Sequence, residues 1–280
     1  MLSICLLLVS LFVQDQPKPL PELRPLLAGL RQTLHTDSQL LSQYTYTERR
    51  TRIDLDSNQK PKSTEVNVFE VFPGSRERVG YRRQVVKKGV PLTAAELKKE
   101  NQELQKRIET AQHKRNLQTP AEREKARAER SRKEEQILDD VFGVYEVEIV
   151  GREKLADRST ILVRFRPRLS HTPKTREGKS MQHIAGRAWI SEEDYQVARV
   201  EMEVIEPISM GLGILAKLQK GASITAERQK FNEEIWLPVK TDISVNARVL
   251  LLKGFNIRQV VEYSDHKKYS VDTILKFPEP

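Results

Sequence analysis

Side chains with catalytic or metal-binding chemistry are scattered through this sequence of 280 residues. The five histidines never share the short spacing on one element that a metal site requires: His35, His113, His171, His183 and His266. The chain has no phosphate-binding glycine loop, no G-x-S-x-G elbow, no H-E-x-x-H and no C-x-x-C. The sequence therefore predicts a protein that is not an enzyme and that uses no metal and no cofactor.

The formal net charge of +9 suits nucleic acid, an anionic lipid surface or an acidic partner. Basic clusters are interleaved with aromatic residues in "TERRTR", "YRRQVVKK" and "RFRPR", a composition that can bind phosphates and stack bases. These arginines fall on alternating strand positions, where they form the wet face of a sheet, and an exported protein meets little nucleic acid. We expect no nucleic-acid partner.

The first residues read as an export signal. "MLSICLLLVSLFV" has the length of a signal-peptide h-region and is too short for a bilayer span of roughly 20 residues. "QDQPKPLPEL" follows with abrupt polarity, so we expect a signal peptide at 1–16 and an exported chain at 17–280, a single domain. The only cysteine, Cys5, lies inside this run, which leaves a mature chain without disulfides.

The periodicity of the next segments changes from helix to strand. From Pro21 to about Gln43, leucines recur at spacings of three, four and seven, as in an amphipathic helix. "YTYTERRTRIDLD" and "STEVNVFEVF" are rich in β-forming residues and flank the turn "SNQKP". They predict a hairpin, and "RERVGYRRQVVKKG" supplies a third strand.

Residues 93–140 contain no aromatic residue and no glycine but are dense in Lys, Arg, Glu, Ala and Gln. "TAAE" (Thr93 to Glu96) and "TPAE" (Thr119 to Glu122) both match the capping box that begins a helix. The segment is therefore predicted to be a helical hairpin inserted between strands. It is either a solvated insertion or an arm that docks a partner.

From Val144 onward apolar residues alternate with polar ones, as in "YEVEIV", "STILVRF", "YQVARVEMEV" and "TDISVNARV". This period of two marks antiparallel strands with one covered and one wet face. We predict an α+β fold, a curved antiparallel sheet forming an open or half barrel, with helices covering its inner surface and a charged helical-hairpin insertion.

Several phrases of this half resemble the outer-membrane lipoprotein-sorting (LolA-like) superfamily of periplasmic carriers. They are "ILVRFRP", "GRAWISEEDYQVARVEMEV", "ITAERQKFNEEIWLPVKTDISV" and "RQVVEYSDHKKYSV". Trp189 precedes a turn that holds Glu192, Glu193 and Asp194, and Trp236 begins "WLP". The resemblance covers roughly 140–273 and implies an unclosed barrel whose cavity holds acyl chains.

One stretch stands out as apolar and rich in glycine, "PISMGLGILAKLQKG" from Pro207 to Gly221. It is either a flexible lid that contacts an acyl chain or the membrane surface, or a plug that fills the end of the barrel. Replacement of Leu212 and Leu215 by Asp separates the two, because only the plug is needed for folding. The predicted lipid contacts are Trp189, Tyr195, Met202, Ile208, Met210, Leu212, Leu215, Leu218 and Trp236.

The function that follows is a periplasmic, non-enzymatic carrier that binds a lipid or an acylated protein in the cavity of a half barrel. The alternative is an envelope scaffold that docks a partner protein through the 93–140 insertion. A deletion of 93–140 separates them, because a scaffold would lose its partner and a carrier would keep its lipid.

Overall fold

The computed structural model describes residues 18–34, 44–72, 80–168, 170–210, 216–249 and 254–268. The predicted signal peptide, Leu212 and Leu215 lie outside these ranges. So do Leu40 and Leu41 of the predicted first helix, whose described part, α1, spans Leu23–Leu34.

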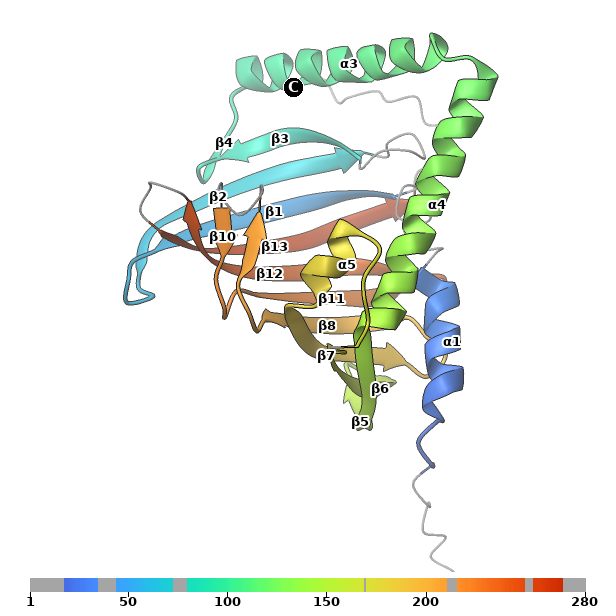
Figure 1. The fold of residues 1–280 in the computed structure, drawn as a ribbon. Coiled ribbons are helices and arrows are strands. Elements are labelled where there is room, and N and C mark those ends of the chain that lie inside the picture. The colour runs from blue at the N-terminus through green and yellow to red at the C-terminus, as the bar shows by residue number, and fades with distance from the viewer. Residues whose placement is uncertain are drawn as a thin grey trace, which may run out of the picture.

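The described strands form a single antiparallel sheet that curves and does not close (Figure 1). Its order is β4-β3-β2-β1-β13-β12-β11-β8-β7-β6-β5, and the short strands β9 and β10 pair beside β12. The predicted α+β fold with an open antiparallel sheet is confirmed. The amino-terminal strands are β1 Tyr44–Leu55, β2 Pro61–Phe72, β3 Tyr81–Lys87 and β4 Val90–Pro91. The remaining strands are β5 Tyr145–Leu155, β6 Arg158–Pro167, β7 Ile184–Ser191, β8 Val197–Val204, β9 Ile208–Met210, β10 Ala216–Leu218, β11 Ser223–Phe231, β12 Ile235–Val249 and β13 Phe255–Lys268.

The two groups of strands join through β1 and β13, the first and last strands of the sheet in sequence. Their register runs from Tyr44 opposite Lys268 to Leu55 opposite Asn256. Eleven of the twelve residues of β1 thereby find partners more than two hundred positions later. Nothing in local periodicity predicts that pairing.

The charged insertion forms two long helices, α3 Ala94–Asn116 and α4 Pro120–Val144. Both predicted capping boxes are present: the Thr93 and Thr119 hydroxyls accept from the backbone N–H of Glu96 and Glu122, whose carboxylates accept from the threonine N–H. Figure 1 shows α3 lying along β3 and α4 meeting it at a corner, then descending to β5. The insertion thus links the two ends of the sheet.

Specific polar contacts join α3 and α4 to the rest of the chain. Arg107 of α3 donates to the backbone carbonyl of Arg82 at 3.0 Å, which satisfies an acceptor on strand β3. Arg31 of α1 donates to Asp139 of α4 at 2.8 Å. Asp140, buried in α4, accepts from the backbone N–H and the hydroxyl of Thr175 at 2.7 and 2.6 Å, at the start of the short helix α5 (Arg176–Met181).

The core identifies the covered face of the sheet. Leu26 of α1 packs on Ile161, Val163, Ala188 and Ile190, which belong to β6 and β7. Residues paired directly across strands share a face, so this face also carries Val200, Ala226, Thr241 and Val261 in one cross-strand row. We call it the helix face. The predicted alternation is confirmed, since Val147 and Ile149 of β5 also pack against this core.

Candidate functional site

An apolar pocket of about 230 Å³ opens on the helix face where β8, β11 and β12 meet β10. Met202, Ile224 and Ile243 form its floor, because they are directly paired across three neighbouring strands. The other apolar lining residues are Ile184, Val204, Leu218, Ala222 and Val245, and Glu203, Ser223 and Ser244 complete the wall. The alternation of apolar and polar residues along the strands marks these positions in the sequence. Of the residues that line the pocket, only Met202 and Leu218 were among the predicted lipid contacts.

The glycine-rich stretch supplies one wall of this pocket. Residues 208–210 and 216–218 form the hairpin β9–β10, in which Ile208 is paired with Leu218. Leu218 in turn is paired with Ala247 of β12, so Ile208 and Leu218 share the helix face with the pocket. The described part of the stretch is therefore an extension of the sheet beside the cavity. Met210 lies in β9 by its backbone.

Trp189 lies away from the pocket, on the opposite face of the sheet. It follows Ala188 of the core and is paired with Leu162 and Arg199. Its indole N–H donates to Glu153 at 2.7 Å, and the guanidinium groups of Arg187 and Arg199 lie 5.5 and 5.1 Å from its ring centre. Cation–π contacts of this kind cover an aromatic ring on a polar surface.

Tyr195 serves as the docking point of α1. Its carbonyl accepts from the Thr33 hydroxyl at 3.1 Å, and a Cβ added at Gly29 would lie 2.5 Å from its ring. The tyrosine ring therefore rests directly on the helix backbone. Its side chain is partly exposed but is engaged by α1.

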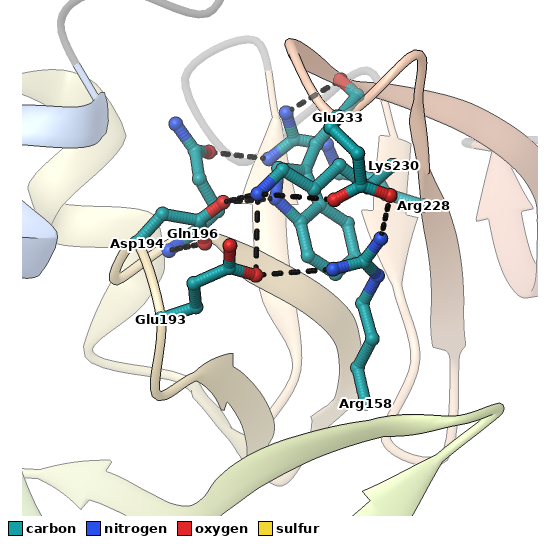
Figure 2. Close-up of polar contacts among 8 residues, drawn as sticks. Arg158, Glu193, Asp194, Gln196, Arg228, Lys230 and Glu233 are labelled. Atoms are coloured by element: carbon teal, nitrogen blue, oxygen red, sulfur yellow. Dashed lines mark hydrogen bonds and ion pairs between the residues drawn. The ribbon is translucent and has the colours of Figure 1, made fainter.

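Trp236 belongs to a polar network at the turns, which we call the turn cluster. Figure 2 shows the other members: Arg158, Glu193, Asp194, Gln196, Arg228, Lys230 and Glu233. Lys230, with a side chain only 7% exposed, lies 3.0 Å from Asp194, 3.2 Å from Glu193 and 3.8 Å from Glu233. Arg158 pairs with Glu193 at 3.0 Å and with Glu233. The cluster joins the β5–β6, β7–β8 and β11–β12 turns.

The electrostatics of the turn cluster keep its groups charged. Asp194 raises the pKa of the Lys230 ammonium above its usual value, against the effect of burial. Burial raises the pKa of Asp194, but hydrogen bonds from Trp236, Ser191 and Lys230 outweigh it and hold that pKa below its ordinary range. The Trp236 indole N–H donates to Asp194 at 2.9 Å, and Arg228 donates to the Trp236 carbonyl at 2.8 Å. The residues that carry the sequence resemblance, the acidic turn and "WLP", thus fix turns to one another.

A second carboxylate binds the amino-terminal segment to the same end of the sheet. Glu192 accepts two hydrogen bonds from Arg152, at 2.8 and 2.9 Å, and one from Ser159 at 2.6 Å. Arg152 also donates to the backbone carbonyl of Pro19 at 2.9 Å. The Arg152 guanidinium lowers the pKa of Glu192 to about 2.

In the described ranges, no three His, Cys, Asp or Glu side chains gather as metal ligands. Among the helices of those same ranges, none combines the length and the apolar character needed to cross a bilayer.

Solved structures with a similar arrangement include two of the class that the sequence resembles. A LolA superfamily protein from Nitrosomonas europaea is 10% identical with a TM-score of 0.32, over 89% of this chain and 94% of that one. An outer membrane lipoprotein-sorting protein domain from Vibrio parahaemolyticus is 9% identical with a TM-score of 0.33, over 89% and 94%. The MucA/MucB complex of Pseudomonas aeruginosa is 10% identical with a TM-score of 0.24, over 86% and 99%. At such TM-scores the similarity carries no conclusion about a ligand or partner.

The sequence matches no family profile and no curated protein.

Proposed function

We propose that the chain is a periplasmic carrier that binds an acyl chain of a lipid or lipidated protein in the helix-face pocket. The observation that supports this function is the apolar floor of Met202, Ile224 and Ile243 beside the β9–β10 hairpin. Burying one aliphatic side chain against a ligand contributes roughly 1.5–3 kcal/mol. At about 230 Å³ the pocket is smaller than the roughly 300–1,000 Å³ of drug-sized ligand sites, which favours one acyl-chain end.

Export supports the same function, since the amino-terminal apolar run reads as a signal peptide. No catalytic group is required of a carrier. The predicted lid at Leu212 and Leu215 stays a prediction.

The test is a charge placed in the pocket floor. Ile224→Glu should weaken uptake of a fluorescent fatty acid by at least tenfold, because roughly 1.5 kcal/mol of apolar contact is replaced by a charge that must be desolvated. Thr225→Glu is the matched control, because Thr225 is the next residue of β11 and faces the other side of the sheet. Equal uptake by both variants and the natural chain would contradict the assignment.

A second candidate function is partner docking through α3 and α4. Residues 112–135 are all exposed, an unbroken stretch around the corner between the two helices. Such a stretch adds little to the core and is available to another protein. Charge reversal at Arg123, Arg127 and Arg130, which recur along one side of α4, would abolish partner binding and leave acyl-chain uptake intact.

A further inference from the structure

The helix face carries one buried carboxylate, Glu48 of β1, with a side chain only 2% exposed. Arg82 of β3 donates to it from Nε at 3.0 Å and from Nη2 at 2.9 Å. Arg50 of β1 donates from Nε at 3.0 Å and from Nη2. Burial raises the pKa of Glu48, yet the two guanidinium groups outweigh it and hold the pKa below its ordinary value. One negative charge therefore faces two positive ones.

The two arginines keep donors for a further acceptor. A guanidinium carries five N–H donors, and no described residue hydrogen-bonds Nη1 of Arg50 or of Arg82. Their side chains are 34% and 31% exposed. The Phe69 ring, 4.9 Å from the Arg50 guanidinium carbon, restricts the plane of that group.

A buried ion pair on its own contributes little to stability, because desolvation offsets the attraction. Two arginines oriented by one shared carboxylate do, however, form a preorganised site for a second anion, since planar guanidinium groups match carboxylate and phosphate geometry. The next arginine along β1, in contrast, is neutralised by neighbouring carboxylates. Arg52 donates to Asp54 at 3.1 and 3.0 Å and lies opposite Glu65, so no excess positive charge remains there.

This arginine site and the pocket lie on the same face. Arg50 is paired with Val261, and Val261 with Thr241, in the row next to the pocket row of Met202, Ile224 and Ile243. Strand β1 is two strands from β12, about 10 Å at the usual strand spacing. An extended amphiphile can therefore span from the pocket to the arginines.

We propose that Arg50 and Arg82, oriented by Glu48, bind the anionic head group of an amphiphile whose acyl chain occupies the pocket. The inference rests on the proposed function and adds the ligand class to it. The chemistry that the site recognises is a carboxylate or phosphate with an attached chain.

The experiment compares cis-parinaric acid with its uncharged methyl ester by fluorescence titration of the full chain. The acid should bind at least tenfold more tightly than the ester, the scale of one charge-assisted hydrogen bond. Arg50→Lys and Arg82→Lys keep the charge beside Glu48 but remove the planar guanidinium group with its paired N–H donors. Each variant should therefore lower the ratio of acid affinity to ester affinity, while ester binding stays unchanged. Arg258→Lys is the matched control, because Arg258 bonds Asp242 on the opposite face at 2.6 Å.

The outcomes are distinct. Equal binding of acid and ester, or lysine variants that retain the full ratio, would overturn the head-group site and leave the carrier function standing. No binding of either probe would overturn both. Inorganic phosphate that binds as tightly as the acid, measured by calorimetry, would assign the arginines to a free anion and overturn the amphiphile. If one lysine variant loses its circular dichroism spectrum, the other decides.

Discussion

At the scale of single residues, charged side chains fix the turns of the turn cluster to one another, whereas an excess positive charge remains around Glu48 of β1. The turn cluster is closed, since Lys230 meets carboxylates from two turns and Arg158 meets two of the same carboxylates. Glu48, in contrast, has one more arginine than it needs for neutrality. The difference separates a structural network from a candidate binding site.

We predict that Glu192 makes the free energy of unfolding depend on pH in the acidic range. Its pKa of about 2 in the folded chain lies below the value near 4.5 of a free glutamate, so it stabilises the fold above about pH 4.5. That contribution is lost as the pH falls from 4.5 toward 2. Glu192→Gln should therefore lower the free energy of unfolding in urea at pH 7 and flatten its decline below pH 4.5.

Glu193→Gln serves as the comparison, because Glu193 is the more exposed neighbour in the same turn. Urea midpoints at pH 7, 4 and 3 for the three proteins are sufficient. Parallel pH curves for Glu192→Gln and the natural chain would show that this carboxylate does not couple to folding.

At the scale of elements, close backbone contact positions α1 on the sheet. Gly29 faces the ring of Tyr195, and an added Cβ would lie 2.5 to 2.9 Å from three of its atoms. Alanine in a helix is otherwise better than glycine by about 1 kcal/mol. Gly29→Ala should nevertheless destabilise the protein, by about 1–3 kcal/mol in chemical denaturation, because the helix must move off Tyr195.

Gly151→Ala is the control substitution, since no atom lies within 4 Å of a Cβ at that position. It should leave the denaturation midpoint close to that of the natural chain. A Gly29→Ala protein more stable than the natural chain would mean that helix propensity outweighs the contact and that α1 docks loosely.

Local signals in the sequence were sufficient for most elements. Alternation predicted the strands of the carboxyl-terminal half, and the Thr93 and Thr119 capping boxes fixed where α3 and α4 begin. The role of Trp189 was harder, because tryptophan is apolar enough to suit either face, and only its pairing with Arg199 places it opposite the core. The Glu48 site was not predicted, because alternation alone does not give the register that brings Arg82 of β3 to Glu48 of β1.

At the scale of the whole molecule, one sheet runs through both halves of the chain, so we predict a single cooperative unfolding transition. Trp189 lies in β7 and Trp236 in β12, which are the sixth and the third strand from β2 in the strand order. Val71→Ala in β2, where the side chain is 1% exposed, should destabilise the protein by about 1–3 kcal/mol and shift the tryptophan fluorescence transition with it.

Val90→Ala is the exposed counterpart in the same group of strands and should leave that transition in place. The prediction fails if Val71→Ala leaves the tryptophan fluorescence transition unchanged while circular dichroism shows a second unfolding transition. The chain would then contain two folding units.

The pairing of β1 with β13 also determines when one edge of β1 is covered and can no longer pair with another chain. The first strand to leave the ribosome waits for residues 256–268 before that edge is filled, and until then its backbone N–H and C=O groups are open to any other strand. Pairings so distant in sequence make folding slow. If the chain is exported as proposed, slow folding keeps it able to thread a translocation channel, while this edge of β1 stays exposed until the last strand is available.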